Sequence, residues 1–129
     1  MASESTRVPS IPDDGNLERY VEQRLFEERI GTLSDHAARK AALGDERRYA
    51  ILFVLWERDE MARKELASAI DDEGFDLTHH LGELVDVGLV ARTGTPEGED
   101  GRQTFYTITH LGRQEIESDY HNITGSNPA

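Results

Sequence analysis

Cysteine is absent from the 129 residues of this chain, and long apolar runs are absent as well. Without a thiol, the chain cannot form disulfide bonds, thiolate metal sites or a thiol redox sensor. No segment approaches the run of about 20 apolar residues that a membrane-spanning helix requires. The N-terminal segment also lacks the basic and apolar regions of a signal peptide. Together these absences predict a cytoplasmic protein without a membrane partner.

The motifs of the common enzyme classes are missing too. There is no phosphate-binding loop, no nucleophile elbow and no pair of carboxylates in an evident cleft. The sequence therefore indicates neither an enzyme nor a protein that carries a cofactor.

Positive charge is scarce. Lysine and arginine together number 14 against 26 acidic residues, which gives a formal net charge of −12, and Lys40 and Lys64 are the only lysines. A chain rich in acids and poor in lysine is similar in composition to halophilic proteins, which work in molar salt; an ordinary acidic protein is the alternative. At about 1 M salt the Debye length is about 3 Å, so the repulsion among these charges is largely screened.

The length allows one domain with a modest core. Apolar residues make up 36% of the chain, which is low for a monomer, so we expect apolar surface to be buried in a homodimer. Residues 1–15 and 124–129 hold little to bury and are predicted to form a flexible arm and a loose tail.

Residues 60–92 contain the pattern around which the rest of the chain is organised. A short helix is predicted from Glu60, because its apolar residues recur at helical spacing. A break follows at residues 71–74, and Asp76 is placed to cap a second helix. The apolar stripe of that second helix consists of Leu77, Leu81, Leu84, Val85 and Gly88. Gly88 is expected to end the helix in a left-handed conformation.

Two predicted strands follow the second helix. Leu89–Thr93 forms the first, residues 93–101 with their glycines form a hairpin tip, and residues 102–109 return as the second strand. Two helices joined by a tight turn and followed by a hairpin are typical of a winged helix-turn-helix. The predicted fold is therefore mainly α with a small β-hairpin, with the helix-turn-helix over residues 62–88 and the wing over residues 89–109.

Further helices surround this unit within residues 16–123. Asn16 is placed to cap a helix that starts at Leu17 and ends at Gly31, and Ser34 to cap a second one that ends at Gly44. Asp45 caps a central helix over residues 45–59, and a last helix is predicted over residues 110–123. We expect the outer helices to form the dimer interface, or alternatively only to cover the core. The interface candidates are Leu17, Tyr20, Val21, Leu25, Ile30, Ile116 and Tyr120.

Two segments carry a family resemblance. LTHHLGELVDVGLV (residues 77–90) resembles the recognition helix and following strand of winged-helix repressors of the arsenic-repressor type. YTITHLGRQEI (residues 106–116) resembles the junction of wing and last helix in the phenolic-acid (PadR-like) and multiple-antibiotic-resistance repressor types. With the acidic composition, the chain is similar to haloarchaeal winged-helix regulators, closest to those of the reactive-oxygen-species response. The resemblance implies a homodimeric DNA-binding transcription regulator used under oxidative stress.

The recognition helix supplies the predicted contacts with double-stranded DNA. The apolar stripe leaves His79, Gly82 and Glu83 pointing outward, with Thr78 and His80 on the flanks. His79 and Thr78 are suited to bases or phosphates, and Glu83 to a cytosine amine. An exposed polar pair without a function is the alternative for the two histidines.

Phosphate contacts are predicted at cations near this helix and in the wing. The candidates are Arg47, Arg48, Arg63, Lys64, Arg92, Arg102 and Gln103. Between Met61 and Arg113 acids nevertheless outnumber bases, so no basic patch forms. We expect binding at high salt, with salt ions as candidate partners at the DNA interface, to depend on hydrogen bonds and DNA shape.

Two other functions fit parts of the pattern. Asp119 and His121 resemble half of a zinc site in some metal-sensing repressors, but the other half is missing, so no metal site is predicted. The leading hypothesis is a homodimeric regulator of pseudo-palindromic operators. The alternatives are a winged-helix protein-interaction module, which tolerates an acidic surface, and a repressor controlled by a metal or another effector.

Overall fold

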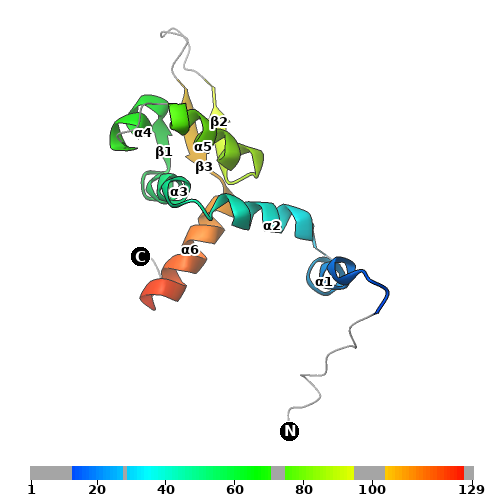
Figure 1. Ribbon diagram of the computed structural model, residues 1–129. Coiled ribbons are helices and arrows are strands. Elements are labelled where there is room, and N and C mark those ends of the chain that lie inside the picture. Colours follow the sequence, from blue (N-terminus) through cyan, green and yellow to red (C-terminus); the bar gives the residue numbers. More distant parts are fainter. Residues whose placement is uncertain (1–12, 28, 71–74, 95–103, 127–129) are drawn as a thin grey trace. The chain divides into compact units, whose positions relative to one another are not determined.

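The computed structural model describes residues 13–27, 29–70, 75–94 and 104–126 (Figure 1). The chain divides into two compact units, residues 1–37 and residues 38–129, and each is described by itself. Among the described residues no helix combines the length and the apolar character that crossing a membrane would take.

The first unit contains helix α1, Leu17–Phe26. The side chain of Asn16 accepts a hydrogen bond of 3.0 Å from the backbone N–H of Arg19, which confirms the predicted cap. The helix ends at Phe26, earlier than the predicted end at Gly31. There the chain turns instead, with the N–H of Arg29 bonded to the carbonyl of Phe26. No residue of α1 is buried.

Helix α2, Leu33–Ala42, begins in the first unit and ends in the second. Thr32 takes the capping role that was predicted for Ser34, because its hydroxyl accepts from the N–H of Asp35 at 3.1 Å. Ser34 therefore lies inside the first turn. Within the first unit, the carboxylate of Glu22 accepts from the N–H of Leu33 at 2.9 Å and so ties α1 to the start of α2.

Helix α3, Glu46–Arg58, is the central helix of the second unit (Figure 1). Asp45 caps it as predicted, by accepting from the N–H of Arg48 at 3.0 Å. Its apolar stripe enters a core that it shares with β1, α4, α5, β2, β3 and α6. The members of the core are Ile51, Leu52, Leu55, Met61, Leu66, Leu77, Leu81, Leu84, Leu89, Val90, Tyr106, Ile108 and Ile116.

Strand β1, Glu60–Ala62, replaces the start of the helix that the sequence predicts from Glu60. It pairs antiparallel with β3, with Glu60 opposite Thr107, and this pairing with a distant segment overrides the local helical spacing. Helix α4, Arg63–Ile70, starts immediately after it. The Glu65 carboxylate accepts from the N–H of Ala62 at 2.8 Å, which satisfies one of the free donors at the start of α4.

Helix α5, Phe75–Asp86, is the second helix of the helix-turn-helix. Asp76 lies in the first turn of α5 rather than at the cap position. From there its negative charge stabilises the helix by interacting with the positive end of the helix dipole. Gly88 ends the segment at φ 82°, as predicted. The N–H groups of Gly88 and Leu89 bond to the carbonyls of Val85 and Leu84, both at 3.0 Å, which satisfies the last carbonyls of the helix.

Strands β2, Val90–Thr93, and β3, Phe105–Ile108, complete an antiparallel sheet in the order β1-β3-β2. Val90 lies opposite Ile108 and Thr93 opposite Phe105, so the pair forms the base of the predicted wing. The predicted tip lies mostly outside the described residues. The structure is the predicted winged helix-turn-helix, with β1 as a strand that the sequence pattern did not reveal.

Helix α6, His110–Thr124, packs against α3 (Figure 1). Side chains of α2 and α3 hold its acidic residues: Lys40 pairs with Glu115 at 2.8 Å, Trp56 donates to Glu117 at 3.1 Å, and Tyr49 donates to Asp119 at 2.6 Å. Ile116, predicted to lie at a dimer interface, is 1% exposed and belongs to the core of its own chain. That part of the interface prediction is therefore wrong.

Candidate nucleic-acid interface

The first turns of α5 present their polar side chains to solvent. Leu77, Leu81 and Leu84 are buried, as the apolar stripe predicts. Thr78 and His79 lie between them in sequence and are exposed. Because α5 rests on the core along one face only, the opposite face is available to enter a groove of DNA.

Gly82 lies one turn beyond Thr78 and leaves the helix backbone uncovered. A Cβ atom added to Gly82 would meet nothing within 4 Å, so the space above it is open. Glu83 follows and is half-buried. A ligand or another molecule can therefore approach the helix backbone more closely at Gly82 than at positions that carry a side chain.

Arg63 and Thr78, two predicted DNA contacts from different helices, lie together in the structure. The guanidinium Nη2 of Arg63, at the start of α4, donates to the hydroxyl of Thr78 in the first turn of α5. Lys64 is exposed beside Arg63 on the same helix. This contact places positive charge next to the N-terminal end of α5, where a phosphate would also meet the positive end of the helix.

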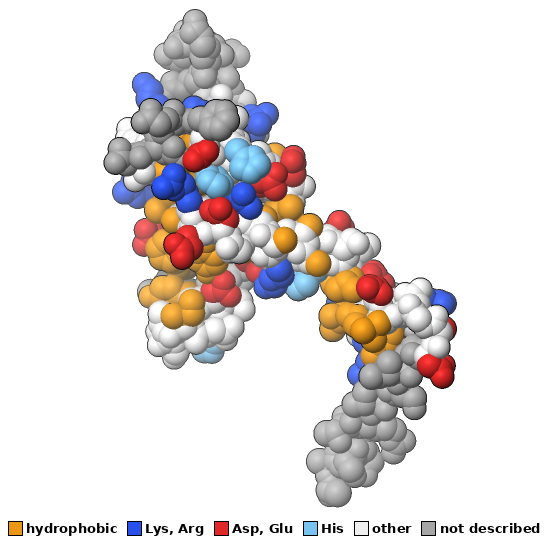
Figure 2. Space-filling model, in the orientation of Figure 1, with side chains coloured by type: hydrophobic (Ala, Val, Ile, Leu, Met, Phe, Trp, Pro, Cys, Tyr) orange, Lys and Arg blue, Asp and Glu red, His pale blue; other side chains and the backbone are white. Residues whose placement is uncertain are grey.

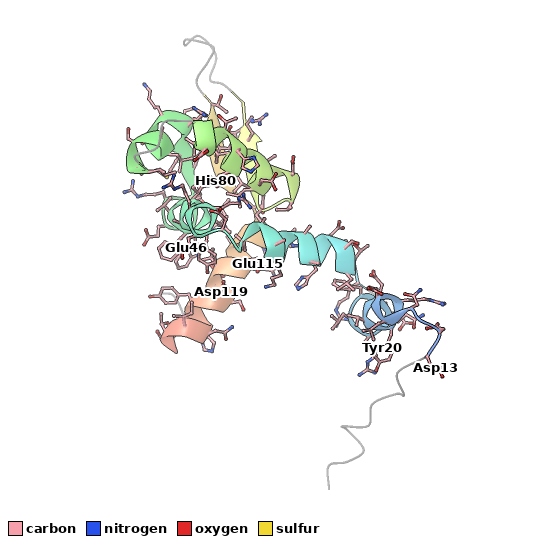
Figure 3. All side chains as sticks on the ribbon, viewed as in Figure 1. Asp13, Tyr20, Glu46, His80, Glu115 and Asp119 are labelled. Atoms are coloured by element: carbon pink, nitrogen blue, oxygen red, sulfur yellow. The ribbon has the colours of Figure 1, made fainter. Side chains whose placement is uncertain are left out.

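His80 and Arg48, two further predicted DNA contacts, lie against each other within the domain. His80 is 8% exposed, and its Nδ1 accepts a hydrogen bond of 3.3 Å from the Nε of Arg48 (Figure 3). The Nη1 of Arg48 donates to the carbonyl of Ala42 at 3.1 Å. Both side chains thus make contacts within the domain, and their contact with DNA stays a prediction. The spacing contained a signal for His80, since it lies three residues after Leu77 and four before Leu84.

Asp45 completes this cluster as the cap of α3. The hydrogen bond from the backbone N–H of Arg48 lowers the pKa of the Asp45 carboxyl, and the nearby charge of the Arg48 guanidinium lowers it further. Arg47, the adjacent predicted contact, is exposed and borders an apolar hollow lined by Ala50, Val54 and Ile70 among others. Of the predicted pair, Arg47 is exposed and Arg48 is half-buried.

The base of the wing carries Arg92. Its guanidinium lies 5.9 Å from the centroid of the Tyr106 ring, a contact that orients this exposed side chain. Arg102 and Gln103, predicted to contact phosphates from the tip, lie outside the described residues.

The charges over α4 and α5 are mixed. Figure 2 shows histidine, arginine or lysine, and acidic side chains interspersed on this face, without a continuous basic patch. The acidic setting expected from the composition is therefore present at the surface that would meet DNA.

Asp119, which with His121 resembles half of a zinc site in the sequence, has a structural partner in the fold. The Asp119 carboxylate accepts a hydrogen bond from the hydroxyl of Tyr49. Burial of that hydroxyl and this hydrogen bond raise the pKa of Tyr49. Within the part of the chain that the structure describes, no three histidine or acidic side chains are grouped so as to hold a metal ion.

Comparison with known proteins finds one matching domain model and a set of similar structures. The model of a helix-turn-helix domain matches residues 43–93, which extend from the end of α2 to β2. None of the curated proteins matches the chain.

Several solved structures share its fold. Reduced HlyU from Vibrio cholerae N16961 is 25% identical with a TM-score of 0.58, over 70% of this chain and 88% of that one. An ArsR-like transcriptional regulator from Rhodococcus sp. RHA1 is 25% identical with a TM-score of 0.54, over 71% and 81%. Reduced AbfR bound to DNA is 23% identical with a TM-score of 0.56, over 88% and 73%.

These matches agree with the geometry of the exposed helix. A helix-turn-helix domain that folds like winged-helix transcriptional regulators indicates a DNA-binding regulator rather than an enzyme. Residues 43–93 are thus matched as a helix-turn-helix domain, and the fold is that of winged-helix regulators of the ArsR-like kind.

Proposed function

We propose that the protein is a homodimeric, sequence-specific transcriptional regulator that inserts α5 into the major groove of DNA. The observation that carries the proposal is the exposed first turn of α5, where Thr78 and His79 face solvent and Arg63 is held against Thr78. The structure of AbfR bound to DNA, which has a similar fold, supports the proposal.

The contacts divide into two groups. His79 is the first candidate to read a base edge, because its side chain is exposed on α5. Arg63 and Thr78 form a unit suited to one phosphate, with Lys64 beside it and Arg92 on the wing strand. Arg102 and Gln103 stay phosphate candidates on the strength of the sequence alone. Gly82 permits close approach, and Glu83 is placed for a cytosine amine.

A second copy of the chain would cover the apolar surface of α3 and α6. There the ring of Trp56 lies tilted against those of Phe53 and Tyr120, with centroids 5.4 and 5.6 Å apart, and Ile123 is 79% exposed on α6. A hollow of about 230 Å³ opens between Phe53, Tyr120 and Ile123. In the first unit, Leu17 and Leu25 are also about half exposed. Exposed apolar residues of this kind favour burial between two chains.

The two-fold symmetry of such a dimer would require a DNA site with matching symmetry. Two copies of α5 would read two half-sites of a pseudo-palindrome whose centres lie about one helical turn apart, roughly 34–36 Å.

The acidic composition supports function at high salt. Where counterions are already concentrated, their release on binding contributes little, so we expect a shallow dependence of affinity on salt. The sequence resemblance further supports a role in the oxidative-stress response. Because the chain has no cysteine, its response to peroxide would not pass through a thiol of its own.

A gel shift with the DNA upstream of the protein's own gene, at molar potassium chloride, tests this function. A discrete complex that survives an excess of unrelated duplex is expected, with an affinity that changes little between dilute and molar salt. Absence of any complex would instead favour a protein-interaction module, and a complex lost steeply as salt rises would contradict the salt proposal.

A further inference from the structure

An apolar hollow of about 230 Å³ lies between α3 and α4. Helix α3 contributes one side of its first turns, and α4 contributes its last two residues. The residues that line the hollow are Arg47, Ala50, Ile51, Val54, Ala69 and Ile70. Five of these six are aliphatic, and Arg47 is the charged member of the set. An aliphatic hollow with one cation is suited to a ligand that is apolar along its length and anionic at one end.

The spacing of the lining residues along α3 gives the hollow a direction. Arg47 lies in the first turn of α3, and Ala50 and Val54 follow on the same side of the helix, since residues three or four apart are neighbours on a helix surface. Arg47 and Val54 are separated by about 10 Å along the helix axis. The positive end of the helix dipole coincides with the guanidinium. The favoured place for an anion is therefore one end of the hollow, and the apolar lining extends away from it.

The size of the hollow favours a small molecule over a protein segment. A cavity of about 150 Å³ already holds a benzene molecule, so this hollow has room for a short aliphatic chain. A protein partner would need a rim of exposed apolar residues around it. None of the large apolar side chains that are exposed in the described part of the chain lines the hollow; these are Leu17, Leu25, Ile30, Leu111 and Ile123.

We propose that this hollow binds an aliphatic carboxylate, with its chain against Ala50, Val54 and Ile70 and its carboxylate paired with Arg47. A chain of about eight carbons has an extended length comparable with the distance from Arg47 to Val54. Burial of the chain supplies most of the affinity. The guanidinium recognises the carboxylate, because its N–H groups can bond to both carboxylate oxygens.

The consequence of binding for regulation rests on the proposed function. Arg47 is exposed and is one of the predicted phosphate contacts. A guanidinium that is paired with the ligand no longer offers its charge to a DNA phosphate, and the bound carboxylate repels that phosphate. The ligand therefore weakens DNA binding by competition at Arg47, and α5 does not need to move.

The first experiment measures the binding of octanoate to the whole chain by isothermal titration calorimetry in molar potassium chloride. We expect saturable binding with a dissociation constant below about 1 mM. Arg47→Gln should weaken the binding of octanoate roughly threefold to tenfold, as for one lost hydrogen bond, and should leave the binding of octanol unchanged. Arg58→Gln removes an exposed arginine from the other end of α3 and serves as the control. Absence of saturable binding, or an equal effect of Arg47→Gln on the acid and the alcohol, would overturn the proposal.

Methyl NMR locates the bound chain. Octanoate should shift the methyl signals of Val54 and Ile70 and leave that of Ile123, which borders the hollow between α3 and α6, unchanged. Ala50→Leu fills the hollow from an exposed position and should weaken octanoate binding at least about threefold. Ala38→Leu makes the same change at an exposed position of α2 and should have no effect. Shifts at Ile123 alone would overturn the assignment.

A gel shift with and without octanoate tests the competition, with a duplex that the protein selects from a random pool. Saturating octanoate should weaken binding by the wild type roughly threefold to tenfold and should not weaken Arg47→Gln further, because that variant already lacks the contact. Circular dichroism in octanoate measures loss of fold separately. Unchanged DNA affinity of the wild type would overturn the competition. If octanoate binds as expected but no duplex is selected, the site stands and the proposed DNA function fails. If octanoate does not bind, the inference fails whether or not the protein binds DNA.

Discussion

Gly112 of α6 lies against the carbonyl oxygen of Leu89, so close that a Cβ atom on Gly112 would stand 2.4 Å from it. The same atom would stand 2.7 Å from the Cγ1 of Ile108. Leu89 precedes β2 and Ile108 ends β3, so this close approach joins the last helix to the base of the wing. The glycine in the segment THLGR is therefore required by packing, even though it lies inside a helix.

Gly112→Ala should destabilise the fold. The added methyl group must push α6 away from a backbone atom, which has no rotamer by which to move aside, and we expect a loss of about 1–3 kcal/mol in the free energy of unfolding. Urea denaturation measures it. Gly82→Ala, the matched change on α5, meets no atom within 4 Å and should raise stability by up to about 1 kcal/mol through helix propensity. Equal effects at both sites would contradict the packing account.

Gly82→Ala should also weaken DNA binding while it stabilises the protein. If the backbone at Gly82 approaches the floor of a groove, a methyl group there removes contact area and costs affinity, whereas the fold gains. We expect opposite signs for the two effects, measured by fluorescence anisotropy with a selected duplex and by urea denaturation. Unchanged affinity would show that this turn of α5 stays clear of DNA.

Tyr49→Phe should make stability less sensitive to alkaline pH. Burial and the hydrogen bond to Asp119 raise the pKa of the Tyr49 hydroxyl, so the folded state favours the protonated phenol. This contribution is complete below the ordinary tyrosine pKa near 10 and is lost as pH rises through the raised pKa. Near neutral pH the variant should lose about 1–3 kcal/mol, as for a hydrogen bond to a charged group. Urea denaturation from pH 8 to 11 should show the difference shrinking.

Ile123→Glu should separate the proposed dimer without unfolding the chain. Ile123 is 79% exposed on α6, so a carboxylate there is solvated in the monomer but would be buried against a second copy. We expect the dissociation constant of the dimer to rise at least about tenfold in sedimentation equilibrium. Asn122→Glu adds the same charge at an exposed neighbour and serves as the control. A dimer that is equally stable in both variants would place the interface elsewhere.

The features that the sequence predicted well are local ones. Asn16 and Asp45 cap their helices by bonding to N–H groups a turn away, and Gly88 ends α5 because glycine readily adopts a positive φ. The buried stripe of α5 follows from the helical period alone. Each of these depends on neighbours within a few residues, which a sequence displays directly.

The features that it missed depend on distant partners. Glu60–Ala62 forms a strand because β3 offers it a paired edge, and Gly112 is needed because the Leu89 carbonyl lies above it. Arg48 was predicted to face phosphate, whereas its partner His80 lies on another helix. Nothing in the sequence around Arg48 indicates that contact. The sequence therefore predicted the fold better than it predicted the partners of individual arginine side chains.

The double substitution of Thr78 and His79 by alanine tests the central claim most directly. Both side chains are exposed on α5, so circular dichroism and urea denaturation should remain close to wild type. Affinity is measured at molar potassium chloride for a selected duplex and for a duplex of scrambled sequence. We expect the selected duplex to lose roughly tenfold or more, at about 1–3 kcal/mol for the lost base contact of His79, while the scrambled duplex loses less, because only the Thr78 phosphate contact affects it. Undiminished preference for the selected duplex would contradict the claim that α5 reads the DNA.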